Sequence, residues 1–130
     1  MSKTYRVAIV GFCHMHVNHV ADLYAAHPQV QWAACADTRP LCPERRVAPY
    51  TRQWNLDHLA KKLGLPKVFD DYREMLRQEK PDLVIVSCEN AQHPDVGEAC
   101  AASGTHVCVE KPMAAALADA LRMHRACEAA

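Results

Sequence analysis

The stretch RVAIVGFCHMHVNH, residues 6–19, decides the fold of this chain. Its first half is an apolar run that stops at Gly11, which is the pattern of a buried strand in a parallel sheet. Glycine permits a tight turn there, and the dozen residues that follow have the pattern of a helix. A strand, a glycine turn and a helix place backbone N–H groups and the positive end of the helix where a phosphate group can bind.

This turn matches the dinucleotide-binding fingerprint at one position of three. The fingerprint uses glycine for the turn, for close approach of the pyrophosphate and for packing of the helix on the strand. Gly11, Cys13 and His16 stand at these places. The turn alone is therefore weak evidence for a dinucleotide.

Composition limits the class of protein. The chain has 130 residues, which suit a single domain over residues 1–130. Half of the residues are hydrophobic and the formal net charge is zero, so nothing favours nucleic acid or a membrane surface as a partner. No apolar stretch approaches the roughly 20 residues that span a bilayer. Seven cysteines without CxxC spacing disfavour a disulfide framework, and we expect a cytoplasmic protein.

Strand and helix patterns alternate along the whole chain. The expected strands are residues 5–10, 30–36, 67–69, 83–87 and 105–109. The expected helices are residues 14–26, 55–63, a helix capped by Asp70 or Asp71, 94–102 and 113–127. In the first helix, Met15, His19, Val20 and Leu23 share one face and are expected to face inward. The alternation predicts an α/β fold, a doubly wound and mainly parallel sheet with helices on both faces.

The ligand site of such a sheet lies outside the carboxyl ends of its strands. Four segments with polar or glycine residues follow expected strand ends: residues 11–14, Asp37, residues 87–93 and residues 110–112. The fold therefore predicts that these segments converge.

The chain resembles the N-terminal Rossmann domain of the Gfo/Idh/MocA family (glucose-fructose oxidoreductase, inositol dehydrogenase, rhizopine catabolism). The resemblance rests on VAIVG with His19 eight positions after its glycine, Asp37, DDYREML, PDLVIVSCENAQH and above all GTHVCVEKPMA, and it covers essentially all 130 residues. It implies an oxidoreductase that transfers a hydride between NAD, with NADP as an alternative, and a sugar, cyclitol or related secondary alcohol. It also implies a second, substrate-binding domain that these residues do not contain, so we expect an incomplete enzyme that is inactive alone. The alternative is a non-catalytic module that binds a dinucleotide or a partner.

Several residues are candidates for the cofactor site. Asp37 can accept the ribose hydroxyls, or is a solvated loop residue or a helix cap. Arg39 can pair with a 2′-phosphate, although an ordinary surface arginine is the default interpretation. Asn90 and His93 can line the nicotinamide side, or merely form an Asx turn and a helix cap. The resemblance implies that Lys111 is catalytic and binds the substrate oxygen, where its ammonium stabilises alkoxide charge; an ion pair is the simpler reading. The full expected cofactor set is Gly11, Cys13, His14, Met15, Asp37, Arg39, Ser87, Asn90, His93, Glu110 and Lys111.

Three residues depart from the family pattern. Cys13 replaces a glycine, and its side chain is expected to crowd the pyrophosphate. His16 replaces glycine or alanine and is expected to push the helix away from the sheet. Glu89 stands where similar sequences often have proline.

Cys13, His14, His16 and His19 also have the residue types of a zinc site. The HxH pair after a strand also resembles that of metal-dependent amidohydrolases, but those take further ligands from later strands of a barrel far longer than this chain. His14 and His16 are two apart and would point to different faces of a helix. We therefore expect no metal. The simpler reading is an exposed His14, a His16 at the edge of the pocket and a His19 hydrogen-bonded against the sheet.

The end of the chain predicts self-association. Residues 105–109 would form a sheet edge without a further strand, and a bare edge is a template for association. The apolar side of the last helix, with Leu117, Leu121 and His124, would also lack cover.

Overall fold

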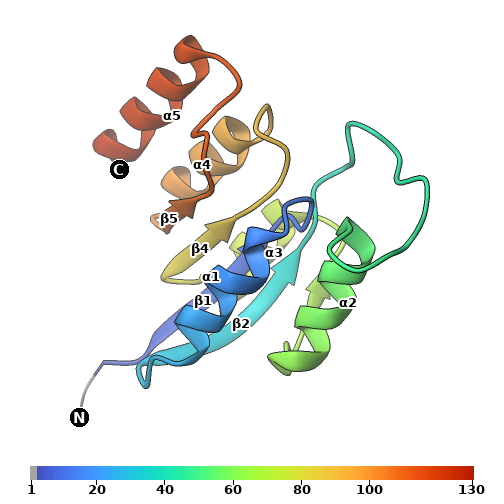
Figure 1. The fold of residues 1–130 in the computed structure, drawn as a ribbon. Helices are drawn as coiled ribbons and strands as arrows, with labels where there is room; N and C mark the ends of the chain where they lie inside the picture. The colour runs from blue at the N-terminus through green and yellow to red at the C-terminus, as the bar shows by residue number, and fades with distance from the viewer. Residues whose placement is uncertain (1–2) are drawn as a thin grey trace.

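The computed structural model describes residues 3–130, which form a parallel sheet with helices packed on both faces (Figure 1). The strands are β1 (Tyr5–Val10), β2 (Val30–Ala36), β3 (Val68–Phe69), β4 (Leu83–Val86) and β5 (His106–Val109). The helices are α1 (His16–Ala25), α2 (Arg52–Lys62), α3 (Tyr72–Glu79), α4 (His93–Ala102) and α5 (Leu117–Ala129). The predicted doubly wound α/β fold is confirmed.

The sheet has the strand order β3-β2-β1-β4-β5, with every neighbouring pair parallel. The chain runs outward from β1 to β3 on one side and then crosses to β4 on the other. The order therefore reverses between β1 and β4, and a crevice opens at their carboxyl ends in folds of this type.

Each face of the sheet has its own apolar core. On one face, Val17 of α1 and Leu59 of α2 pack with Val7 and Ile9 of β1. On the other face, Met75 of α3 packs with α4 and with the strand residues that alternate with those of the first core. Helix α5 lies on the outer side of α4 (Figure 1). The central strands are buried on both faces, which explains their continuous apolar runs.

The first helix differs from its prediction in its start and in its inward face. It begins at His16 instead of residue 14, because His14 and Met15 belong to the turn after β1. Its buried residues are Val17, Asn18 and Ala21. Met15, His19 and Leu23 are exposed, so the expected face was wrong. The small or β-branched side chains of Ala21 and Val17 fit the close contact of α1 with the sheet. Asn18 is buried because its amide has polar partners, Met15 O and Asn55 Oδ1.

Other boundaries move by a few residues. Helix α2 begins at Arg52, three residues earlier than expected, and α5 begins at Leu117, four residues later. Asp71 is the N-cap of α3 and accepts a hydrogen bond from Arg73 N at 2.8 Å, as one of the two predicted alternatives. Over the described residues, no helix combines the length and the apolar character needed to cross a membrane.

Candidate cofactor site

Gly11 forms the predicted turn at the end of β1. It has φ +89°, in the left-handed region that favours glycine, and its N–H donates to Ala36 O at 3.0 Å. A Cβ on Gly11 would overlap the backbone of Cys88, just after β4. Glycine is therefore required here by the close approach of two strand ends.

Cys13 turns its side chain toward β4. Its Sγ lies 3.5 Å from the carbonyl oxygen of Ser87. Burial, and next the negative charge of Glu89, raise the pKa of the thiol to about 11. Cys13 is thus a protonated, half-buried thiol at neutral pH, and the crowding of a pyrophosphate by its side chain stays a prediction.

Arg52, at the start of α2, is the central charge of this edge of the sheet. Its Nη1 lies 2.5 Å from Asp37 Oδ1, and its Nη2 lies 2.5 Å from Glu89 Oε1. The Arg52 side chain is 11% exposed, and the two carboxylates are 21% and 23% exposed. One guanidinium therefore joins the ends of β2 and β4 to the first turn of α2.

Glu89 has a structural role that its sequence position did not reveal. Burial opposes its negative charge, but hydrogen bonds from Arg52 and from backbone N–H groups outweigh burial and hold the pKa of this carboxyl below its ordinary value. Glu89 Oε1 also accepts from Leu41 N at 3.1 Å, and Gln92 Nε2 donates to Arg39 O at 2.8 Å. These bonds hold the irregular segment 37–51 against the start of α4.

Two buried amides fasten the turn after β1 to α1 and α2. Asn18 Nδ2 donates to Asn55 Oδ1 at 2.9 Å, and Asn55 Nδ2 donates to Phe12 O at 2.9 Å. Asn18 Nδ2 also donates to Met15 O at 3.1 Å. The segment that would bind phosphate is therefore held by side chains from both neighbouring helices.

Buried oxygen atoms without a hydrogen-bond partner gather at the same edge. Among the described residues they include Thr38 Oγ1 after β2, Ser87 Oγ after β4 and Gln92 Oε1 before α4. A buried polar atom without a protein partner is costly, so water, an ion or a ligand supplies the missing bond. Ribose hydroxyls and phosphate groups have the matching hydrogen-bonding chemistry, so these residues fit a dinucleotide.

His93, a candidate for the nicotinamide side, is the first residue of α4. It is fully buried, with Nε2 3.0 Å from Cys88 O and Nδ1 3.1 Å from Pro112 O. The ring therefore lies between the segment after β4 and the segment after β5, with a carbonyl oxygen beside each nitrogen, and as a neutral imidazole it donates to one of the two. His93 thus positions the segments that follow β4 and β5 relative to each other.

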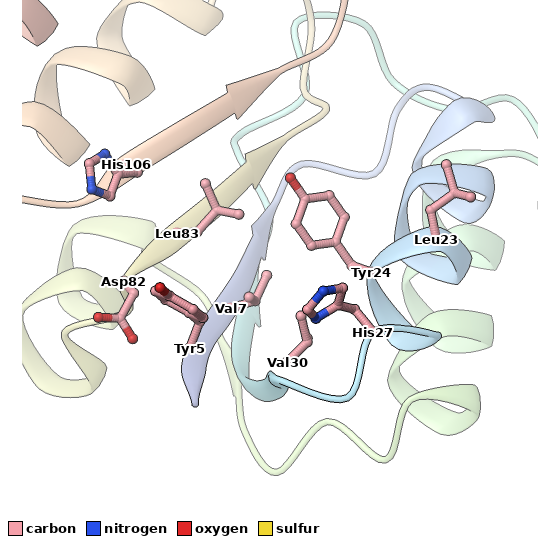
Figure 2. Close-up of a pocket in the computed structure, with 9 residues that line it drawn as sticks. All are labelled: Tyr5, Val7, Leu23, Tyr24, His27, Val30, Asp82, Leu83 and His106. Carbon is pink, nitrogen blue, oxygen red and sulfur yellow. The ribbon is translucent and has the colours of Figure 1, made fainter. Parts of the chain in front are cut away.

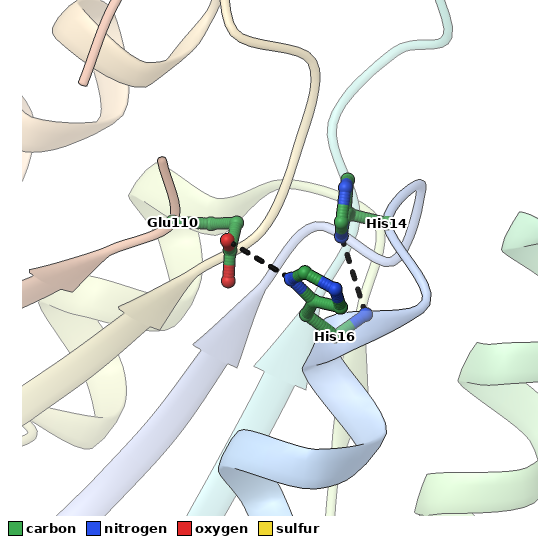
Figure 3. Close-up of side chains that lie close together, drawn as sticks. All are labelled: His14, His16 and Glu110. Carbon is green, nitrogen blue, oxygen red and sulfur yellow. Dashed lines mark hydrogen bonds and ion pairs between the residues drawn. The ribbon is translucent and has the colours of Figure 1, made fainter. Parts of the chain in front are cut away.

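His14, His16 and Glu110 meet at the ends of β1 and β5 (Figure 3). His16 Nδ1 lies 3.2 Å from Glu110 Oε1, and His14 Nδ1 accepts from His16 N at 3.2 Å. The expectation that His14 and His16 point apart was wrong, because α1 begins at His16 and leaves His14 in the turn. The reading of His14 as exposed and of His19 as hydrogen-bonded against the sheet was also wrong, since His14 is half-buried and His19 is exposed on α1.

The remaining candidates are at or near the surface. Met15, Arg39 and Lys111 are exposed, and Asn90 is half-buried. Lys111 directly follows Glu110 at the end of β5, so the structure brings it to the edge where β1 and β4 also end.

Sequence reasoning missed Arg52 and Asn55. Both lie in α2, which was predicted from its apolar pattern. Asn55 stands on the same face as the inward leucines of that pattern, and a polar residue at such a position was a usable signal. Arg52 had no local signal, because its two partners are distant in sequence.

Comparisons with known proteins agree with this fold. A family model described as an oxidoreductase family with an NAD-binding Rossmann fold matches residues 5–130. The chain is 35% identical over 72 residues to the myo-inositol 2-dehydrogenase of Thermotoga maritima, which is 55% of this chain and 22% of that enzyme. It is 32% identical over 70 residues to a D-xylose 1-dehydrogenase (NADP(+)) of Haloferax volcanii, with 54% and 22% covered.

The same fold occurs in a solved structure of the WlbA dehydrogenase from Bordetella pertussis in complex with NADH and UDP-GlcNAcA. The TM-score is 0.76 at 23% identity, and the match covers 99% of this chain and 34% of that one. The chain therefore spans about a third of the length of that dehydrogenase.

Proposed function

We propose that the chain supplies the cofactor half of a dehydrogenase for a sugar, cyclitol or related secondary alcohol. The chain belongs to the Gfo/Idh/MocA oxidoreductases and forms their NAD-binding Rossmann domain, which is the basis of this proposal. The observation that carries the proposal is the set of unpartnered buried oxygens of Thr38, Ser87 and Gln92. These residues follow the carboxyl ends of β2 and β4, on the side of the sheet where ligands of this fold bind.

Asp37 favours NAD over NADP in this proposal. Its Oδ1 is occupied by Thr38 N at 2.8 Å and by Arg52, which leaves Oδ2 to accept a ribose hydroxyl. The Asp37 carboxylate would repel a 2′-phosphate on that ribose. Arg39, two residues further along the chain, is an exposed cation, and we expect its attraction for the phosphate to be weaker than this repulsion. We expect Asp37→Ala to narrow or reverse the preference for NADH, and an unchanged ratio would show that Asp37 does not contact the ribose.

Lys111 is the proposed catalytic residue. NAD accepts the hydride when it is bound, and the ammonium of Lys111 would hold the substrate oxygen and stabilise its developing negative charge. Lys111 is exposed at the end of β5, so its ammonium is accessible to a substrate. Because the chain spans about a third of its structural relative, the substrate site and the general base are assigned to a second domain. The chain by itself is then expected to bind the cofactor without turnover.

The test is titration of the purified chain with NADH and NADPH, followed by nucleotide fluorescence. We expect saturable binding that favours NADH. The matched variant is Cys13→Gly, which removes the side chain beside the turn and is expected to bind more tightly than the parent. Absence of saturable binding in both proteins would favour the alternative, a module that binds a partner instead of a dinucleotide.

A specific observation supports such a partner surface. An apolar hollow of about 450 Å³ lies at the opposite end of the sheet, between the last turn of α1 and the first residues of β1, β4 and β5. Figure 2 shows Tyr24, Leu83 and His106 around this space. Strand β5 is the sheet edge next to it, and Leu117 and Leu121 are exposed on α5.

We infer that the β5 edge of the sheet and the apolar hollow next to it carry the expected self-association. An exposed strand edge and exposed apolar side chains both favour contact with a second copy. Sedimentation at micromolar concentration tests it, and a clean monomer would contradict it.

A further inference from the structure

Two imidazoles and one carboxylate lie close together at the carboxyl ends of β1 and β5. One ligand atom each from His14, His16 and Glu110 lies within 4.8 Å of the other two. His14 is in the turn after β1, His16 is the first residue of α1, and Glu110 follows β5 (Figure 3). We propose that these three side chains bind one divalent transition-metal ion of the zinc type, with a water molecule in the fourth position.

The spacing of the first pair already suits an ion. Zinc bonds to imidazole nitrogen and carboxylate oxygen are about 2.0–2.2 Å long, so neighbouring tetrahedral ligands are roughly 3.3 Å apart. His16 Nδ1 and Glu110 Oε1 are 3.2 Å apart. A cation can therefore replace the proton that these two atoms share, with little movement of either side chain.

His14 completes the set with a small rotation. Its ring lies 4.4 Å from the ring of His16, measured between centroids. Because His14 Nδ1 accepts a hydrogen bond from His16 N, its proton is on Nε2 and the lone pair is on Nδ1. Turning that lone pair toward the ion exchanges one 3.2 Å hydrogen bond for a metal–nitrogen bond.

The ligand chemistry selects the class of metal. Magnesium and calcium prefer oxygen ligands, whereas two imidazoles with one carboxylate suit zinc and similar ions. His14 Nδ1 already accepts a backbone hydrogen bond, so its lone pair is available to an ion. Burial opposes the charge of Glu110, but the hydrogen bonds from His16 and from the backbone N–H of Lys111, together with the nearby imidazoles, outweigh burial and lower the pKa of the carboxyl.

The site has access to solvent. The His16 side chain is 40% exposed and that of Glu110 is 13% exposed, so the carboxylate is fixed while the ion can exchange ligands. Three protein ligands with an open position are the arrangement of metal sites that bind water or substrate oxygen. This inference stands on the three side chains and does not depend on dinucleotide binding.

The experiment is titration of the chain, without a tag and without nucleotide, with Co²⁺ followed by visible absorption and with Zn²⁺ followed by calorimetry. We expect one equivalent of each metal per chain. His14→Gln, His16→Gln and Glu110→Gln should each weaken binding at least 10-fold, as loss of one ligand of three requires. The matched control is His19→Gln, which changes an exposed histidine of the same helix and should leave binding unchanged.

Circular dichroism of each variant verifies folding, so weaker binding is attributed to the lost ligand. Binding that is absent, or that stays the same in all three ligand variants, would overturn the proposal. Loss of binding on Cys13→Ser, with a sulfur charge-transfer band in the cobalt spectrum, would also overturn it by assigning the metal to the thiol.

Discussion

Replacement of Arg52 by methionine isolates the charge network between β2, α2 and β4. Methionine keeps much of the aliphatic length but leaves Asp37 and Glu89 facing a site without a cation. Removal of one partner from a fully buried ion pair costs about 3–5 kcal/mol, and from an exposed pair about 0.2–1 kcal/mol. Arg52 is 11% exposed and its partners are about a fifth exposed, so we expect a loss of about 2 kcal/mol in the free energy of unfolding at pH 7.

Urea unfolding measures this loss as a decrease of about 1 M in the midpoint. The folded-state pKa of Glu89 is lowered, so its contribution is present above the unfolded-state pKa and is lost as pH falls through the folded-state pKa. The deficit of the variant should therefore shrink below about pH 5, as the Glu89 carboxyl takes up a proton. The matched control is Arg122→Met on α5, whose partners lie on the surface and whose loss should be clearly smaller. A deficit equal to that of the control, or one that does not change between pH 7 and pH 4, would refute the reasoning.

Three further substitutions test local features. Gly11→Ala places a Cβ against the backbone of Cys88 at a positive φ and should destabilise the chain by more than about 3 kcal/mol, seen as loss of a cooperative melt; a normal melt would contradict the close approach. Asn55→Leu leaves the carbonyl of Phe12 without its donor and should lower the free energy of unfolding by about 2 kcal/mol in urea, whereas a neutral result would show that water replaces the amide. Asp71→Ala removes the cap of α3 and should cost about 1 kcal/mol by the same assay, with no change in the binding of NADH.

The alternation of short apolar runs with helical patterns was sufficient to predict the parallel sheet. A strand buried on both faces has to be continuously apolar, and helix caps and glycine turns act over a few residues. The five strands were placed to within one residue at each end for this reason. Helix starts were less well predicted: α1 and α5 have no side-chain cap hydrogen bond, so no capping residue in the sequence marks where they begin.

The sequence by itself determined the parallel α/β architecture, the glycine turn after β1 and the edge at which Asp37, Ser87 and Glu110 would gather. These features depend on residues close together in the chain or on the parallel direction of neighbouring strands. The tertiary structure alone decided how those side chains are paired. Arg52 joins two carboxylates that lie 15 residues before and 37 residues after it, and Glu110 meets His16 across 94 residues. No periodic pattern in the sequence records such contacts, because they depend on which loops the folded sheet brings together.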